Sequence, residues 1–335
     1  MSHYKIVFDN NMIHNPDVEE RVIRERGCKN SYELVLASRR DLNAFLNTAA
    51  DADAVCAYIA FPPEVLDRLP KCQVVAIQAM GADFCDGVAA TERGICMSNL
   101  PVYCVEEVAT HTCALLLDCC RSISAMDRRL RTGVWDTQAR GTLYRLRGRK
   151  YGLVSFGHIA QRAAEMMRGF DLEIQAYDPF LPDEVFEKAG VKRVESLQEL
   201  FATSDLISVH TPLMPQTHHM IGKKEFDAIT KPMIFVVTSR GGVVDEDALK
   251  AALESGKVTS AGLDVIEDEK TFQSVLRGMP QVVITPHTAY SSFEAEQDCR
   301  IINMENILDV LEDKRLPRNS LNPQVEETAR FRQDI

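Results

Sequence analysis

The chain has 335 residues, which suits about two domains at roughly 150 residues each. Hydrophobic residues make up 45% and charged residues 26% of the chain, an ordinary globular composition that argues against a disordered or fibrous protein. The 38 basic and 49 acidic side chains leave a net charge of −11, which disfavours nucleic acid and anionic membranes as partners.

Other features of the composition exclude further classes of protein. The basic stretch Arg140–Lys150 is diluted by aromatic and glycine residues, and we interpret it as a solvated connection. No apolar run approaches the roughly 18 residues that span a bilayer, and the N-terminus lacks the features of a signal peptide. The ten cysteines form no Cys-x-x-Cys pair, which disfavours a zinc site or a disulfide framework. We therefore expect a cytoplasmic protein with reduced thiols, no metal and no membrane contact.

Short apolar runs alternate with amphipathic stretches through the first hundred residues. Strands are predicted at Tyr4–Phe8, Leu34–Ala37, Val55–Ile59, Val74–Ile77 and Cys96–Ser98. Helices are predicted between them at Pro16–Gly27, Arg39–Ala49, Pro63–Leu69 and Ala89–Arg93. Strands that alternate with helices indicate a parallel sheet built from βαβ units.

The remainder of the chain repeats this alternation after a long helix. That helix is predicted from Val105 to about Ile123 and is apolar on more than one side, so it would be buried in a core or packed against another subunit. Strands are predicted at Gly152–Ser155, Glu173–Tyr177, Leu206–His210, Met233–Thr238, Ser260–Asp264 and Val282–Thr285. A late helix, Ala295–Glu312, precedes a packed tail, Leu316–Ile335. The predicted fold class is α/β with parallel sheets.

The segment Tyr151–Gln161 has the layout of a dinucleotide-binding turn. A strand runs to Ser155, a helix opens after Gly157, and Asp178 ends the next strand about 20 residues later. Backbone N–H groups and the helix N-terminus suit a pyrophosphate, and a carboxylate that binds the adenosine ribose repels a 2′-phosphate, which favours NAD over NADP. Of the G-x-G-x-x-G pattern only Gly157 is present, with Ser155 and Ala160 at the outer positions. Taken alone, the loop is equally compatible with an ordinary βα turn.

Three polar residues, Arg240, Glu269 and His287, each follow a predicted strand, where open α/β sheets build their sites. Reduction of a ketone by hydride requires a proton, for which histidine is the natural donor near neutral pH. A neighbouring carboxylate favours the imidazolium, and a guanidinium can hold a substrate carboxylate through two hydrogen bonds. The structural alternatives are an Arg240–Asp245 ion pair, Glu269 as a surface acid and His287 as a strand cap.

Together these segments resemble the D-isomer-specific 2-hydroxyacid dehydrogenase family, which includes phosphoglycerate dehydrogenase. Within that family the chain most resembles the branch of C-terminal-binding-protein-like dehydrogenases. The similarity runs from about residue 70 to residue 322. The matching segments are Asn99–Ala109, Gly152–Ala160, Val209–Leu213 with Gln216 and Thr217, Ser239–Gly242, Ala261–Val265 and Thr285–Ala289.

The resemblance implies an NAD-dependent oxidoreductase (EC 1.1.1.-) that interconverts a 2-keto acid and a D-2-hydroxy acid. Arg240 would hold the substrate, His287 would be the acid–base, and Glu269 would orient and charge His287. The implied NAD contacts are Phe156, Gly157, His158, Ile159, Asp178, His210, Thr211, Pro212, Thr217, Thr238, Asp264 and His287. The implied substrate contacts are Met80, Gly81, Arg240 and Tyr290.

The resemblance also implies a discontinuous domain plan with two Rossmann-like or flavodoxin-like domains and a cleft between them. A substrate domain would comprise residues 1–103 and 292–335, and an NAD-binding Rossmann domain would comprise residues 104–291. Chain crossings near 101–105 and 288–294 would act as hinges. The helix after Pro101 and the loop around Trp135 would form a twofold homodimer contact.

The chain departs from the family pattern at several positions. Besides Ser155 and Ala160, Lys270 replaces the proline usual after the glutamate, and Ile77 replaces an arginine usual in the branch. The altered glycine loop and the branch resemblance leave open a second function, an NAD(H)-sensing, corepressor-like protein-binding module with little or no turnover. The complete set of Arg240, Glu269 and His287, together with the lack of a basic DNA-facing patch, favours the enzyme. A third possibility, formate or phosphonate oxidation on the same scaffold, would not need the Glu–His pair.

Overall fold

The protein is described by a computed structural model that covers residues 2–10, 15–138 and 141–332. Arg140 and residues 333–335, which belong to the predicted basic stretch and tail, lie outside these described residues. The chain forms two compact units, one of Met1–Tyr103 with Ser292–Ile335 and the other of Cys104–Ser291. Among the described residues, no helix combines the length and apolar character needed to cross a bilayer.

The first unit contains a five-stranded parallel sheet with the order β2-β1-β3-β4-β5. Its strands are β1 (His3–Asp9), β2 (Ser31–Ala37), β3 (Ala54–Ala57), β4 (Val74–Ile77) and β5 (Cys96–Ser98). Side chains alternate between the two faces along each strand. Ile6 and Phe8 belong to one apolar cluster and Val7 to another, so both faces of β1 are buried.

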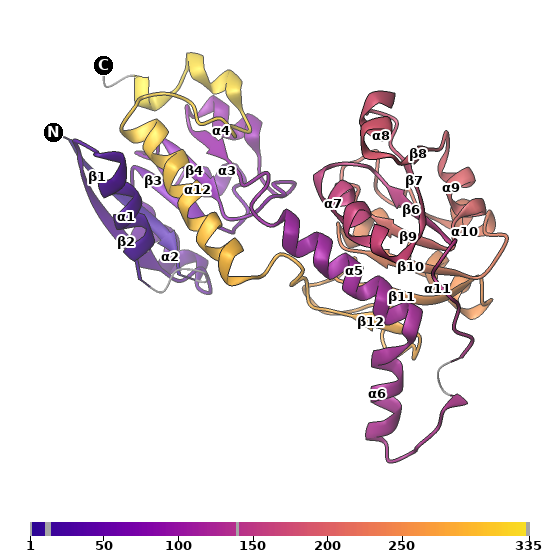
Figure 1. The fold of residues 1–335 in the computed structure, drawn as a ribbon. Helices are drawn as coiled ribbons and strands as arrows, with labels where there is room; N and C mark the ends of the chain where they lie inside the picture. The colour runs from indigo at the N-terminus through magenta and orange to yellow at the C-terminus, as the bar shows by residue number, and fades with distance from the viewer. Residues whose placement is uncertain (1, 11–14, 139–140, 333–335) are drawn as a thin grey trace. The chain divides into compact units, whose positions relative to one another are not determined.

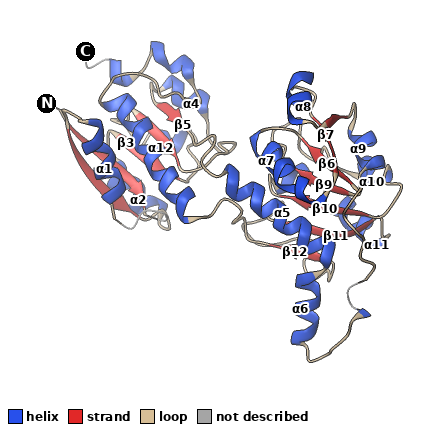
Figure 2. Ribbon diagram, in the orientation of Figure 1, coloured by secondary structure: helices blue, strands red, loops and turns tan. Residues whose placement is uncertain are grey.

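Helices cover both faces of this sheet (Figure 2). The helices of the unit are α1 (Asp17–Arg26), α2 (Leu42–Ala49), α3 (Pro63–Leu66), α4 (Gly87–Glu92) and α12 (Phe293–Leu311). Apolar residues of α2, α3 and α4 pack with Val7, Val55 and Val75. On the opposite face, α1 and α12 pack with Ile6 and Phe8, so a helix from the end of the chain completes the first unit (yellow in Figure 1).

The described part of the C-terminal segment packs within the same unit. It contains two 3-10 helices, η4 (Pro323–Glu327) and η5 (Arg330–Arg332). Val325 and Phe331 are fully buried. Asn322 Oδ1 accepts a hydrogen bond from the backbone N–H of Met97 at 2.8 Å, which fixes the tail to β5.

The second unit contains a seven-stranded parallel sheet with the order β12-β11-β10-β9-β6-β7-β8. Its strands are β6 (Lys150–Val154), β7 (Glu173–Tyr177), β8 (Lys192–Arg193), β9 (Leu206–Val209), β10 (Met233–Val237), β11 (Val258–Leu263) and β12 (Val282–Ile284). The strand order reverses at β6, which creates the switch point where doubly wound sheets bind ligands. The charged two-residue edge strand β8 has no apolar pattern, so it was not predicted.

Helices of the second unit also form two layers. They are α5 (Val105–Arg121), α6 (Ile123–Arg131), α7 (His158–Met167), α8 (Asp183–Ala189), α9 (Leu197–Thr203), α10 (Lys223–Asp227) and α11 (Glu246–Glu254), with 3-10 turns η2 (Arg168–Phe170) and η3 (Gly241–Val243). One apolar cluster joins α5, α7 and α8 to the sheet, and another joins α9, α10 and α11 to it.

The long predicted helix is divided into two helices. It ends at Arg121 because Ser122 adopts the left-handed region with φ 53°, and α6 starts after it. Helix α5 is a core helix: a Cβ added to Gly262 of β11 would lie 2.9 Å from Leu115 Cβ. The core packing of α5 therefore accounts for its apolar faces, whereas α6 has no buried residue.

Candidate active site

The predicted site residues of the second unit all follow the carboxyl ends of its strands. Because the strands are parallel, these ends meet at one edge of the sheet. In sheet order from β12 to β7, the residues within three positions of the strand ends include His287, Asp264, Arg240, His210, Gly157 and Asp178.

The turn after β6 forms although serine stands at its first glycine position. Ser155 has φ 66°, in the left-handed region that glycine adopts most readily. This conformation costs a non-glycine residue on the order of 1–2 kcal/mol. Two contacts hold it: the Ser155 N–H donates to Tyr177 O at 2.8 Å, and Ser155 Oγ lies 2.9 Å from Thr211 Oγ1. The serine therefore joins the nucleotide loop to the segment after β9.

The surroundings of Gly157 and Ala160 show why a loop that lacks two of the three glycines of G-x-G-x-x-G still suits a dinucleotide. A Cβ added to Gly157 would have no heavy atom within 4 Å, so this position at the start of α7 is open. Ala160 is fully buried between helix and sheet. Open backbone at a helix N-terminus is the geometry that binds phosphate groups, and the small residue allows the close packing that this requires. The loop fits the pyrophosphate of NAD.

Phe156 and Asp178 have structural contacts that the sequence did not predict. The Phe156 side chain is fully buried and stacks on Phe186 with ring centroids 5.2 Å apart. Its N–H donates to Asp178 Oδ2 at 2.9 Å, and the Phe180 N–H donates to Asp178 Oδ1 at 2.9 Å. Asp178 thus fixes the nucleotide loop, and its remaining lone pairs can accept ribose hydroxyl protons. Gly157, His158 and Ile159 are the more exposed members of the predicted set.

His210 is the first of three side chains that are joined by hydrogen bonds and lead into the core. Its Nε2 lies 2.7 Å from Ser208 Oγ, which lies 2.7 Å from the hydroxyl of Tyr151. Burial lowers the pKa of His210 to about 3. This imidazole is therefore neutral near neutral pH and cannot act as the general acid.

Thr217 closes the turn that follows His210. Its Oγ1 donates to Pro212 O at 2.7 Å and accepts the Met214 N–H at 2.8 Å. Thr211 is buried and contacts Ser155, as described above. The predicted cofactor-lining segment 210–217 is therefore held in one conformation by its own side chains.

The Arg240 loop is shaped by the residue that follows it. A Cβ on Gly241 would lie 2.0 Å from the carbonyl carbon of Ile266, so only glycine lets the loops after β10 and β11 approach this closely. Arg240 Nη1 donates to Ser239 O at 2.9 Å. Upstream, Thr238 Oγ1 lies 2.8 Å from Thr112 Oγ1 of α5, which leaves the Thr238 backbone as the group that can contact a nicotinamide carboxamide.

Asp264 fixes the loop that carries His287. This carboxylate is almost fully buried. Its Oδ1 accepts from Thr285 Oγ1 at 2.6 Å and from the Thr288 N–H at 3.0 Å, and its Oδ2 accepts from the Ala289 N–H at 2.9 Å. The His287 N–H donates to Asp264 O at 2.8 Å. Asp264 therefore holds both sides of His287 in the chain.

His287 and Glu269 form the pair that the sequence predicted. His287 Nδ1 lies 2.9 Å from Glu269 Oε2. The side chain of His287 is 30% exposed and that of Glu269 is 43% exposed. His287 has φ 52°, an uncommon conformation for a residue with a side chain and one that clusters at functional sites. The ring of Tyr290 approaches His287 edge-on, with centroids 6.4 Å apart.

His111 is a further site residue that sequence reasoning missed. Its Nε2 lies 2.9 Å from Thr285 Oγ1 and 3.5 Å from Asp264 Oδ1. Helix α5 thus supports the His287 loop through Thr285 and Asp264. A histidine within an apolar helix pattern gave no indication of this, because its partners lie far along the chain.

Met80 and Gly81 belong to the first unit and follow β4. Met80 O accepts a hydrogen bond from Asn99 Nδ2 at 2.6 Å, and both residues are partly exposed. Ile77, which stands where the branch usually has an arginine, is fully buried in the apolar core.

Comparison with known proteins places this arrangement in a family. Residues 113–289 match the D-isomer specific 2-hydroxyacid dehydrogenase, NAD binding domain. The D-3-phosphoglycerate dehydrogenase of Methanocaldococcus jannaschii is 36% identical over 259 residues, which cover 77% of this chain and 49% of that protein. The glyoxylate reductase of Thermococcus litoralis is 35% identical over 268 residues, which cover 78% of this chain and 80% of that protein. The chain therefore spans about half the length of the first relative and most of the second.

Solved structures show the same architecture. The holo D-mandelate dehydrogenase of Rhodotorula graminis has a TM-score of 0.83 at 26% identity, covering 96% of this chain and 98% of that one. The apo D-lactate dehydrogenase of Escherichia coli has a TM-score of 0.77 at 27% identity, covering 95% and 99%. The predicted family, the α/β fold with parallel sheets and NAD as the cofactor are thereby confirmed. The chain belongs to the D-isomer specific 2-hydroxyacid dehydrogenase family, and residues 113–289 form its NAD-binding domain.

Proposed function

We propose that this chain is an NAD-dependent oxidoreductase that interconverts a 2-keto acid and a D-2-hydroxy acid. The observation that supports this most strongly is the His287–Glu269 hydrogen bond of 2.9 Å, formed at the same sheet edge as Arg240 and the nucleotide loop. When bound, NAD supplies or accepts the hydride.

His287 moves the proton that accompanies the hydride. Because Nδ1 is engaged by Glu269, Nε2 is the nitrogen that carries the transferable proton. It protonates the developing alkoxide in the reductive direction and removes the hydroxyl proton in the oxidative direction. Glu269 fixes the ring orientation and tautomer, and Asp264 fixes the backbone that presents the ring.

Arg240 binds the acid. A planar guanidinium can hold the substrate carboxylate through two hydrogen bonds and polarise the adjacent keto oxygen. Its position follows from Gly241, which brings the Arg240 loop against the backbone at Ile266. The roles of Met80, Gly81 and Tyr290 as substrate contacts stay predictions from the family resemblance.

The proposal is tested by NADH oxidation with a panel of 2-keto acids. Glyoxylate, pyruvate and phenylglyoxylate correspond to the names of the relatives, and hydroxypyruvate extends the panel. We expect steady turnover with at least one acid. No turnover with any of them, although NADH binds, would instead support the NAD(H)-sensing module.

We further propose that the protein is a cytoplasmic homodimer. The predicted dimer contact used the helix after Pro101 and the loop around Trp135, but α5 is packed in the core, so we place the helical part of the contact on α6. Exposed apolar side chains occur on α6 and in the loop after it: Ile123 is 58% exposed, Leu130 45% and Trp135 87%. Apolar side chains gathered on one helix and its loop suit a self-association surface. The ten free thiols agree with a reducing compartment.

A further inference from the structure

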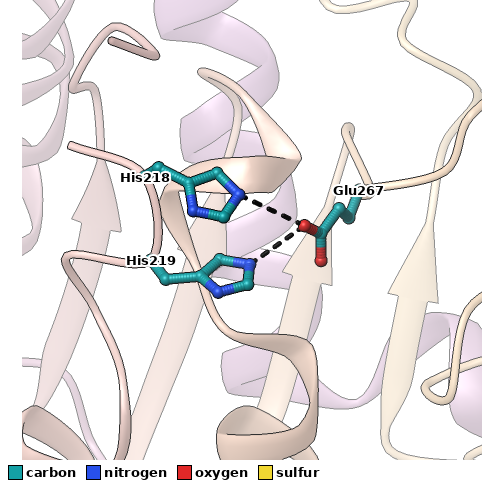
Figure 3. Close-up of side chains that lie close together, drawn as sticks. All are labelled: His218, His219 and Glu267. Carbon is teal, nitrogen blue, oxygen red and sulfur yellow. Dashed lines mark hydrogen bonds and ion pairs between the residues drawn. The ribbon is translucent and has the colours of Figure 1, made fainter. Parts of the chain in front are cut away.

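A second cluster of side chains lies next to the Arg240 loop and has no part in the proposed reaction. His218 and His219 point toward Glu267 from the segment before Ile221 (Figure 3). Glu267 Oε1 lies 3.5 Å from His218 Nε2 and 3.0 Å from His219 Nε2. One ligand atom from each residue lies within 4.8 Å of the other two.

The separations of Glu267 Oε1 from the two imidazole nitrogens suit a metal site. Zinc binds imidazole nitrogen and carboxylate oxygen at about 2.0–2.2 Å in tetrahedral geometry, which places neighbouring ligand atoms about 3.3 Å apart. The two measured separations, 3.5 and 3.0 Å, lie on either side of that value. Imidazole ligands favour zinc, copper, nickel or iron, whereas magnesium and calcium prefer oxygen.

The backbone beneath the cluster is fixed while the side chains remain accessible. His219 has φ 51°, and its N–H donates to Gly242 O at 2.9 Å. The Glu267 N–H donates to Glu246 Oε1 at 2.9 Å. The His218, His219 and Glu267 side chains are 52%, 37% and 43% exposed, so an ion can enter and keep a water ligand. Stacking of the two rings, with centroids 3.9 Å apart, keeps them on the same side.

We propose that His218, His219 and Glu267 bind a divalent transition-metal ion, with Zn²⁺ as the best fit. The ion joins the 218–219 segment to the loop that leads from Glu267 to Glu269. It is a structural clamp on that loop and exchanges no proton or hydride with the substrate.

Titration of the full chain with Zn²⁺ by calorimetry tests this site directly. We expect the wild-type protein to bind one more Zn²⁺ than the double variant His218→Ala/His219→Ala, or to bind it at least about tenfold more tightly. The His3→Ala variant, which removes an exposed histidine outside the cluster, should bind like the wild type.

Two further readouts separate this site from zinc bound elsewhere on the protein. Co²⁺ should give the visible absorption of a tetrahedral complex in the wild type but not in Glu267→Ala. Zn²⁺ should slow amide hydrogen exchange in residues 267–273 of the wild type and not of the double variant. The proposal is wrong if the wild type and the double variant bind Zn²⁺ with equal stoichiometry and affinity. It is also wrong if Zn²⁺ leaves the rate of amide hydrogen exchange in residues 267–273 unchanged. Both outcomes are independent of the result of the dehydrogenase assay.

Discussion

His287 is held at its ring and at its backbone by different residues. Glu269 binds the ring, and the buried Asp264 binds the chain on both sides of it. A residue with φ 52° persists only where its surroundings determine it strongly. The ring and the backbone of His287 are therefore both fixed, which suits the acid–base role that we propose for it.

Replacement of His287 by Ala should lower kcat by on the order of 10²-fold or more, because the reaction loses its general acid–base. Glu269→Gln should lower kcat less, since the amide can still hold the ring. Steady-state NADH oxidation measures both. Glu184→Gln, an exposed substitution on α8, is the matched control. Full activity in His287→Ala would contradict the assignment.

His210 should make the folded protein sensitive to acid. Its pKa falls from 6.5 to about 3 on folding, so below about pH 6.5 the unfolded chain binds a proton that the folded chain does not. This contribution destabilises the fold progressively as the pH falls from 6.5 toward 3. Urea unfolding of His210→Asn should show a smaller loss of stability over that range than the wild type, whereas His3→Asn should follow the wild type. Parallel pH profiles for His210→Asn and the wild type would be the contrary result.

At the element scale, two glycines with opposite surroundings define the site. Gly157 borders open space, whereas a Cβ on Gly241 would collide with the backbone at Ile266. The first glycine suits the cofactor contact that we propose, and the second is needed by the fold.

Gly157→Val should therefore leave the melting temperature within a few degrees of the wild type but weaken NADH binding by at least about tenfold, since the side chain fills the pyrophosphate position. Gly241→Ala should lower stability by about 2 kcal/mol or more through overpacking. Thermal melts and NADH fluorescence titrations check the pair. If Gly157→Val binds NADH normally, the assignment of the nucleotide loop is wrong.

Much of the element pattern could be predicted because buried parallel strands are continuous apolar runs. Val74–Ile77 is such a run and was predicted with the bounds that the structure has, as were Cys96–Ser98 and the mixed strand Glu173–Tyr177. The break at Ser122 could not be predicted, because its left-handed conformation depends on no local sequence preference. The contacts of Asp264 with Thr285, of His111 with Asp264 and of Asp178 with Phe156 were also missed, because each joins residues 21 or more positions apart.

At the scale of the whole molecule, the first unit depends on the end of the chain. Helix α12 supplies Arg300, and its Nη2 lies 2.7 Å from Oε2 of Glu19 in α1. Both side chains are buried. Local sequence pattern cannot show that residues so far apart share a unit. The resemblance to a family, rather than hydrophobic periodicity, implied that plan.

The exposed face of α6 predicts how copies of the chain associate. Leu130→Glu combined with Trp135→Ser should convert a dimer into a monomer, because burying a new charge without a partner is unfavourable. Sedimentation velocity measures the change, and Val88→Glu, an exposed apolar residue on α4, serves as the control. A wild-type protein that sediments as a monomer, or a double variant that stays dimeric, would contradict this prediction.

We propose that hydride transfer to a 2-keto acid takes place at the sheet edge that carries Arg240, Glu269 and His287. The test uses two preparations of NADH, each deuterated at C4 on one face of the nicotinamide ring. Each preparation reacts with the keto acid of the panel that is reduced fastest, and the enantiomers of the product are then separated. We expect a D-2-hydroxy acid with deuterium at C2 from one of the two cofactors, and none from His287→Ala on the same time scale. An L-configured product, or a product without deuterium from either cofactor, would contradict it.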